Sequence, residues 1–463
     1  MSPADLLSLH LMAPVLWGAL AAFILLIILP AGFMPSLFNL VALATTLWMG
    51  CRAHGSLHSV HLAGFNQMVI VDPISAFSTL ILAVAAFMAF LKAPRYLERT
   101  GQSSGEFYFL ALCSLSGMIL TVSTRHLTGL VMGLEAMSLP LYLLIAGHTR
   151  VGRGREAALK YLVLGGASSA LMVFGIALLY GESGNLLFPA TMWSWQISMG
   201  LMGAVFLLAG LLFKIGAFPF QSWVPDVYAH SPTPLVGFMA TAVKLAGAVA
   251  MLRLLSPYLM QGPLAQAIPL VALATMTVGN FMALAPRPPK EILAYSSVAH
   301  TGYALLAFCA PGGAGREALF FYLASYTVMT AGAFAVLSAV PKDDASELRG
   351  LMKRRPGLAL AFAVCILSLA GIPPLVGFHG KLLVFEAAWA SGHSTLVLAA
   401  VANSLVALGY YIPLVKLVLF TEPATERDPT SRSARLSLSC LLGAFLVLAF
   451  GIFPEWLLGL VPR

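Results

Sequence analysis

Long apolar runs separated by short polar loops make up most of this chain. A window of about 20 mainly apolar residues is long enough to cross a bilayer as an α-helix, and such windows predict about fourteen membrane-spanning helices. They fall at 13–31, 35–51, 73–91, 107–124, 126–146, 157–180, 202–228, 233–255, 266–285, 291–310, 317–340, 357–390, 395–420 and 436–456. The pattern therefore predicts an all-α polytopic membrane protein.

The seventh and twelfth of these helices are too long for one straight crossing, and both carry proline inside. Pro219 interrupts 202–228, and Pro373 and Pro374 interrupt 357–390. A broken helix at membrane depth needs protein or a wet cavity to satisfy its free backbone groups. Helices 4–8 and 9–13 each form a set of five whose fourth member is broken. Because an odd number inverts the second set, the pattern predicts two inverted five-helix repeats.

This symmetry divides the chain into four segments. Helices 1–3 occupy residues 1–104, and the first repeat, helices 4–8, occupies 105–258. The second repeat, helices 9–13, occupies 259–425, and helix 14 occupies 426–463. None of the loops is long enough to fold as a soluble domain, so any redox cofactor that drives the protein is expected on another chain.

The basic residues predict how the helices are oriented. Sixteen Lys and Arg residues, Lys92 among them, are assigned to the loops after helices 3, 5, 9, 11 and 13, whereas five lie on the opposite side. The positive-inside rule then puts the sixteen in the cytoplasm and both termini outside. The net charge of +8 follows from these loops and does not indicate nucleic acid as a partner.

Composition supports a membrane protein and argues against several kinds of site. The sequence is 59% hydrophobic and 10% charged, whereas soluble domains carry about 25% charged residues. Its five cysteines are far apart and form no CxxC, so a disulfide framework, an Fe–S site and a structural zinc are not indicated. The run 13–31 follows no basic segment and has no clear cleavage site, so it is interpreted as a retained helix rather than a signal peptide.

Candidate chemistry lies in ionisable residues inside the predicted helices. A charged side chain at the bilayer centre costs about 2.5–3.5 kcal/mol on insertion scales, so such residues usually face a bundle interior or water and serve a function. The residues well inside helices are Glu135, Lys214, Lys244, His300 and Lys381, and Lys160 lies about one turn into helix 6. The pattern suggests a lateral proton path in which a Glu135–Lys214 pair opens and closes, releasing a proton towards Lys244. Polar side chains that could hold water along it are Ser168, Ser169, Tyr295, Ser296, Ser297, Thr301, Ser325, Tyr326, Thr327 and Asn403.

Each of these residues also has a structural interpretation. Glu135 could be the fixed partner of one lysine, His300 could be a neutral hydrogen-bonded histidine, and Lys160 could anchor its helix at the cytoplasmic surface or approach Glu135. Asp226, at the cytoplasmic end of helix 7, is interpreted as a helix stop rather than a proton entry point. His54, His58 and His61 are poorly spaced for a metal, so a solvated loop is favoured.

At these same positions the sequence resembles a known family. LEAMSLPLYLLIA and EAALKYLVLGGASSALMVFGIALLYGESGNL resemble helices 5 and 6 of subunit N of bacterial complex I, the NADH-quinone oxidoreductase. FKIGAFPFQSWVPDVYAHSPTPLVGFMATAVKLA is similar to helices 7 and 8 of that family, KEILAYSSVAHTGY to helix 10, and LAGIPPLVGFHGK to helix 12. The resemblance covers roughly 105–420 and identifies the chain with the antiporter-like membrane subunits, which are related to Mrp-type antiporters.

The resemblance implies a fold of fourteen helices and a proton-translocating role. It assigns translocation to Glu135, Lys214, Lys244 and Lys381, with Lys160 and His300 as accessory members of the path. It implies no cofactor or metal on this chain, because NADH, FMN, Fe–S clusters and quinone belong to partner subunits. The implied partners are the antiporter-like M-type subunit, the small K-, J- and A-type subunits, the peripheral redox arm and the lipid of a bacterial cytoplasmic (inner) membrane.

Three other functions stay open at this point. The chain could be a subunit of a Mrp-type Na⁺/H⁺ antiporter with no redox partner, or of a related membrane arm driven by a hydrogenase. It could also be a scaffold that holds such an arm together without conducting ions. Lys381 in helix 12 and the SLPLY form of helix 5 favour subunit N within the resembled group, as does the expected end of the chain at Arg463.

Overall fold

The structure is a computed structural model. It describes residues 17, 20–21, 35–57, 62–65, 68–147, 152–188, 198–259, 262–310, 312–340, 345–423 and 434–462. The first predicted helix lies almost entirely outside the described residues, as do His58, His61 and both chain ends.

Helices make up nearly all of the described chain. Before the first break they are α3 (Pro35–Gly55), α4 (Pro73–Thr100), α5 (Ser104–Val122), α6 (Leu127–Ala146), α7 (Gly152–Ser183) and α8 (Met199–Ile215). Between the breaks they are α9 (Trp223–His230), α10 (Thr233–Phe238), the π-helical η1 (Met239–Val243), α11 (Lys244–Leu259), α12 (Gly262–Ala283), α13 (Pro289–Leu306), the 3₁₀ turn η2 (Ala307–Cys309), α14 (Gly313–Ala339), α15 (Ala345–Leu348), α16 (Leu351–Arg354) and α17 (Pro356–Ala370). After the second break come α18 (Val376–Ala390), α19 (Ser394–Leu419), α20 (Ala434–Ile452) and α21 (Pro454–Leu458).

Among the described residues, ten helices are long and apolar enough to cross a membrane, and α8 and α17 are shorter apolar helices. The prediction of an all-α membrane protein is confirmed. A short antiparallel hairpin, β1 (Leu62–Gly64) with β2 (Val69–Val71), lies in the connection between α3 and α4. α4 extends well beyond its predicted end at residue 91, because it continues to Thr100. Lys92, assigned above to the loop after it, is therefore part of the helix and is buried.

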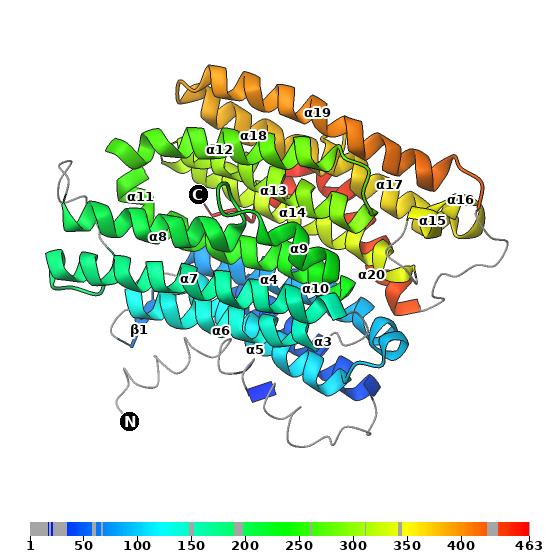
Figure 1. Cartoon of the computed structure of the whole chain (residues 1–463), viewed down its shortest axis with the longest axis horizontal. Helices are drawn as coiled ribbons and strands as arrows, with labels where there is room; N and C mark the ends of the chain where they lie inside the picture. The colour runs from blue at the N-terminus through cyan, green and yellow to red at the C-terminus, as the bar shows by residue number, and fades with distance from the viewer. Residues whose placement is uncertain are drawn as a thin grey trace.

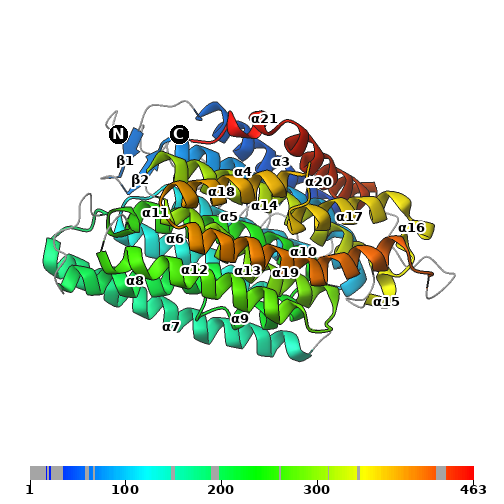
Figure 2. The same cartoon turned by 90° about the horizontal axis from the view of Figure 1, so that it is seen from above.

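The long helices lie side by side along the longest axis of the molecule (Figure 1). In this view the orange helix α19 lies at one edge and the cyan-to-teal helices α5, α6 and α7 lie towards the opposite edge. Seen from above, α7 lies at one edge and α20 with α21 at the other, and α19 crosses between them (Figure 2). Between these edges lies α14, whose most apolar window is fully buried in the protein. It packs on α4, α10, α17, α18 and α20. One interior helix therefore joins helices from the early, middle and late parts of the chain.

Both predicted helix breaks are present. α8 ends at Ile215 with Gly216 in the left-handed region at φ 70°, and α17 ends at Ala370 with Gly371 at φ 90°. Glycine suits both positions because it has no Cβ to clash there. A cis X–Pro bond follows in each break. At the first break Trp223 Nε1 donates to the Phe213 carbonyl at 3.0 Å, a second donor for a carbonyl of the last turn that also accepts from the Gly216 N–H at 3.0 Å.

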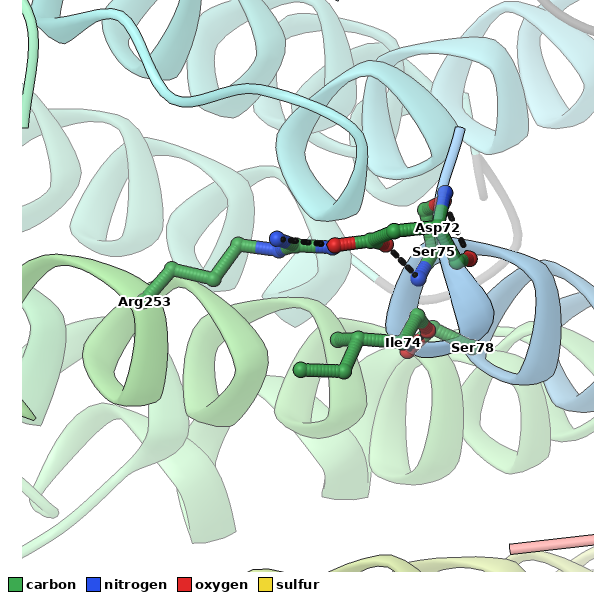
Figure 3. Close-up of polar contacts among 5 residues, drawn as sticks. All are labelled: Asp72, Ile74, Ser75, Ser78 and Arg253. Carbon is green, nitrogen blue, oxygen red and sulfur yellow. Dashed lines mark hydrogen bonds and ion pairs between the residues drawn. The ribbon is translucent and has the colours of Figure 1, made fainter. Parts of the chain in front are cut away.

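A buried ion pair joins α4 to α11 (Figure 3). The guanidinium of Arg253 donates to both carboxylate oxygens of Asp72, at 2.6 and 2.9 Å, and the two side chains are 3% and 1% exposed. Asp72 also caps α4, because it accepts from the Ser75 backbone N–H at 2.7 Å. Burial alone would raise the pKa of Asp72, but the hydrogen bonds and charge of Arg253, together with Ser75, hold that pKa below its usual value.

Candidate functional site

Lys214 and Glu135 lie at the interface of α6, α7 and α8. Lys214 is fully buried one residue before the end of α8, and its Nζ donates to the Ser138 hydroxyl at 2.9 Å. Glu135, half-buried on α6, accepts a short hydrogen bond from the Ser169 hydroxyl of α7. Ser138 is one turn beyond Glu135 on the same helix, and the Glu135 charge acts on Lys214. The predicted direct pair is therefore separated in this structure, with each ion hydrogen-bonded to a serine.

Lys244 occupies the start of α11, directly after the π-helical turn η1. Its Nζ donates to the Thr301 hydroxyl at 2.7 Å and makes a short hydrogen bond to the Ser297 carbonyl. Thr301 in turn donates to the carbonyl of Ile215 at 3.0 Å. That carbonyl is free because α8 breaks at this point, so the break connects the residue after Lys214 to the ammonium of Lys244.

His300 connects the two halves of the site. Its Nδ1 lies 2.7 Å from the Tyr322 hydroxyl and its Nε2 lies 3.1 Å from the Tyr411 hydroxyl. The imidazole is buried and lies within electrostatic reach of both Lys244 and Lys381. Two phenol partners satisfy both ring nitrogens, so the ring can exchange a proton on either side without moving.

Lys381 lies at the second break. Its Nζ donates to the Ala370 carbonyl at 2.9 Å and to the Ser404 hydroxyl at 2.8 Å, and it lies 5.0 Å from the centre of the Tyr303 ring. The Tyr303 hydroxyl accepts from Asn280 Nδ2 at 3.1 Å. Asn280 also contacts Asn403 and Tyr410. The surroundings of Lys381 are therefore polar.

A small cavity lies beside Lys244 and His300. Tyr322 and Tyr326 on α14 form part of its wall. Its exposed lining is almost entirely apolar, which is not the setting in which ordered water is usually held.

Lys160 does not approach Glu135. It is exposed on α7 and pairs with Glu156 at 3.0 Å and with Asp226 of α9 at 3.3 Å. The prediction that it could reach Glu135 is therefore wrong, because α7 begins at Gly152 and places Lys160 two turns into the helix, facing the surface. Asp226 lies near the start of α9 rather than at its end, and it joins α9 to α7.

Several groups of the site were not predicted. Ser138 holds Lys214, Tyr322 and Tyr411 hold His300, and Asn280 and Ser404 lie around Lys381. Their signal in the sequence is weak, because a lone Tyr, Ser or Asn in an apolar helix is usual. In the part of the chain that the structure describes, no group of His, Cys, Asp and Glu side chains is arranged to hold a metal.

A bundle with two broken helices, whose breaks hold buried lysines joined by hydroxyls and a histidine, defines an antiporter-like membrane subunit. The family model described as "NADH:quinone oxidoreductase/Mrp antiporter, TM" matches residues 124–407. The chain is 38% identical to NADH-quinone oxidoreductase subunit N 1 of Herpetosiphon aurantiacus, covering 90% of this chain and 88% of that protein. It is 37% identical to subunit N of Halorhodospira halophila, over 86% and 85% of the two chains.

Solved structures agree with these relatives. A chain of respiratory complex I from Thermus thermophilus superposes with a TM-score of 0.85 at 36% identity, over 97% of this chain and 98% of that one. A chain of the Mrp complex from Dietzia sp. has the same fold at 21% identity, with a TM-score of 0.85 over 98% and 96% of the two chains. The chain belongs to the NADH:quinone oxidoreductase/Mrp antiporter membrane family, and within it to subunit N of NADH-quinone oxidoreductase.

Proposed function

We propose that the buried groups from Glu135 to Lys381 carry protons along the membrane plane within NADH-quinone oxidoreductase, of which this chain is subunit N. Glu135, Lys214, Lys244 and Lys381 bind and release the proton. His300 passes it between the last two lysines, and the accessory Lys160 exchanges it at the surface through Asp226.

One observation carries this proposal: the three buried lysines of this path, Lys214, Lys244 and Lys381, are hydrogen-bonded to neutral oxygens. Lys214 donates to a serine, Lys244 to a threonine and a carbonyl, and Lys381 to a serine and a carbonyl. A lysine held in a tight ion pair would lose that pair on deprotonation, whereas these can become neutral while their partners remain. Burial makes the charged form costly, so a change in a neighbouring charge can shift each proton.

The finer architecture belongs to the same proposal. We infer fourteen helices with two inverted five-helix repeats over 105–258 and 259–425, flanked by 1–104 and 426–463. Both termini lie outside a bacterial cytoplasmic membrane. NADH, FMN, Fe–S clusters and quinone reside on partner subunits, and the neighbours are the M-type and the small K-, J- and A-type membrane subunits together with the redox arm. The break between α8 and α9 lies in the seventh predicted membrane helix, and the break between α17 and α18 lies in the twelfth. This separation of five membrane helices supports the repeats.

The test uses the whole complex in inverted membrane vesicles. Lys214→Met and Glu135→Gln are expected to lower NADH-driven proton translocation by at least tenfold, because a positioned proton-transfer group contributes about 10²–10⁴-fold. Lys416→Met, at an exposed lysine of α19, is the matched control and should pump normally. Full coupled pumping by both test variants in assembled complex would refute the path and favour a scaffold. Pumping that required Na⁺ and no NADH would favour an antiporter.

A further inference from the structure

Lys92 is a buried lysine that the path described above does not use. It lies on α4 eight residues before Thr100, or about 12 Å from that helix end at 1.5 Å per residue. Its side chain is 1% exposed, and its Nζ reaches the Ala331 carbonyl of α14 only at 3.5 Å. No carboxylate of the described chain forms an ion pair with it. A buried lysine so weakly held is costly and calls for a function.

A glycine keeps space open for this ammonium. A Cβ at Gly237 on α10 would lie 2.5 Å from Lys92 Nζ and 3.0 Å from the Phe334 Cβ of α14. Any other residue at this position would push the lysine head away from the seam between α10 and α14. The chain continues from α10 through η1 to α11, whose first residue is Lys244. Lys92 therefore lies against the segment that leads into Lys244.

Three buried hydroxyls near the two lysines lack well-formed hydrogen bonds. Ser297, Tyr326 and Thr330 are each at most 4% exposed, and none of their hydroxyls makes a hydrogen bond of good geometry within the described chain. Ser297 and Thr330 lie next to the Tyr326 hydroxyl. Because leaving a buried hydroxyl unpaired costs about 1–3 kcal/mol, ordered water is the usual partner in such a place.

This row of hydroxyls begins at one lysine and ends beside the other. Lys244 donates to the Ser297 carbonyl and lies 5.8 Å from the centre of the Tyr326 ring. At the far end, Thr330 directly precedes the residue whose carbonyl binds Lys92. The row therefore extends from the residue whose carbonyl binds Lys244 to the turn of α14 whose carbonyl binds Lys92, and water would have to complete the connection.

We propose that Lys92 is a further proton-exchanging residue, joined to Lys244 through Ser297, Tyr326, Thr330 and water held among them. In one transfer the Lys92 ammonium gives its proton to water beside Thr330, the hydroxyls relay it, and a neutral Lys244 accepts it. One N–H bond breaks and one forms, and no oxidant or reductant is needed. The inference rests on the proposed function, because a side branch from Lys92 requires the proton path from Glu135 to Lys381.

The lysine itself is tested by two substitutions in the whole complex in membrane vesicles. Lys92→Met is expected to lower the initial rate of NADH-driven proton translocation by about tenfold, with normal amounts of assembled complex. Lys92→Arg keeps the charge but cannot release its proton, so it should be equally slow. Rescue by arginine would show a fixed charge that only supports the fold, and it would overturn the proposal.

The hydroxyls give a second measurement that does not depend on how well α4 tolerates a change. Tyr326→Phe and Thr330→Val remove hydroxyls that make no hydrogen bond of good geometry within the described chain, so a purely structural Lys92 would leave pumping unaffected by either change. We expect both to slow translocation, whereas the control Ser338→Ala on α14, whose buried hydroxyl is satisfied by the Phe334 carbonyl, should not. Normal pumping by both would refute the branch.

Lys244→Met distinguishes a failure of the Lys92 branch from a failure of the main proton path that it joins. If Lys244→Met stops pumping while the Lys92 and hydroxyl variants pump normally, the branch fails and the proposed function stands. If Lys244→Met also pumps normally, the proposed function itself fails.

Discussion

The Asp72–Arg253 pair allows the sharpest prediction about stability. Nη1 and Nη2 of Arg253 both donate to the Asp72 carboxylate, and Arg253 Nε has no hydrogen-bond partner within the described chain. Asp72→Asn keeps a good N-cap for α4, because asparagine caps about as well as aspartate, but it leaves a buried guanidinium without a counter-charge. Breaking a buried pair in this way costs about 3–5 kcal/mol. A loss of 3 kcal/mol is roughly a hundredfold in the unfolding equilibrium constant.

The companion variants separate the charge from the cap. Arg253→Met should cost a similar amount, since it leaves the carboxylate buried and unpaired. The double variant Asp72→Asn/Arg253→Met should cost clearly less than the sum, because neither charge then remains. Arg95→Met, which breaks the exposed pair with Glu98, is the control and should cost at most about 1 kcal/mol.

Thermal unfolding of the full chain in detergent measures these differences. Cys309, Cys365 and Cys440 are free and buried, so a thiol-reactive fluorescent dye reports their exposure on unfolding. The expected order of melting temperatures is wild type and Arg95→Met above the double variant, and the two single charge variants lowest. Strictly additive costs in the double variant would refute the argument, as would Asp72→Asn melting with the control.

The same pair predicts an acid dependence. Because the pKa of Asp72 is held below its ordinary value in the folded chain, its stabilisation is present above about pH 4 and is lost as the pH falls through the folded pKa. Asp72→Asn should remove this acid sensitivity. In Arg253→Met the sign reverses, because burial without a partner raises the carboxyl pKa, and stability should then fall as the pH rises from about 4. Melting curves from pH 3 to 8 would check both slopes.

Three further changes test the site and its packing. Ser138→Ala removes the hydroxyl that holds Lys214, at a cost of about 1–3 kcal/mol, and should slow proton pumping in vesicles. Lys160→Met should reduce pumping less than Lys214→Met does, because Lys160 and Asp226 are exposed and water can replace the pair. Gly279→Val should lower the amount of subunit in membranes, seen by immunoblot, because a Cβ there would lie 2.4 Å from the backbone of α13.

The sequence predicted what depends on strong local chemistry. Apolar length defines a membrane helix almost regardless of its neighbours, and proline inside an overlong apolar run marks each break, although Pro140, Pro269 and Pro413 lie inside unbroken helices. Both breaks and the described helices, apart from the end of α4, therefore lie within a few residues of their predicted positions. The buried lysines were visible for the same reason, since a charge inside an apolar run is rare. Lys214, Lys244 and Lys381 are indeed fully enclosed.

Features that depend on packing between distant segments were not predictable. The hydropathy pattern predicts a loop at Lys92 because hydropathy falls before α4 ends, whereas packing of α10 and α14 against this part of α4 helps to bury the side chain. The pattern starts the sixth predicted helix at residue 157, whereas α7 begins at Gly152, so it predicts Lys160 only one turn inside the helix and within reach of Glu135. The hydroxyl partners of His300 come from helices 22 and 111 residues away, and nothing local marks them.

The two breaks have a common physical consequence. Ending a helix inside a membrane protein leaves carbonyls that need donors, and no lipid can supply them. At the first break the Ile215 carbonyl is satisfied by Thr301, which also accepts from Lys244. At the second break the Ala370 carbonyl is satisfied by Lys381 directly. The second break therefore creates an acceptor for a buried ammonium, and the first creates an acceptor for the hydroxyl that Lys244 binds. A continuous helix at the second position would leave Lys381 with one partner fewer, and at the first it would leave Thr301 with one acceptor fewer.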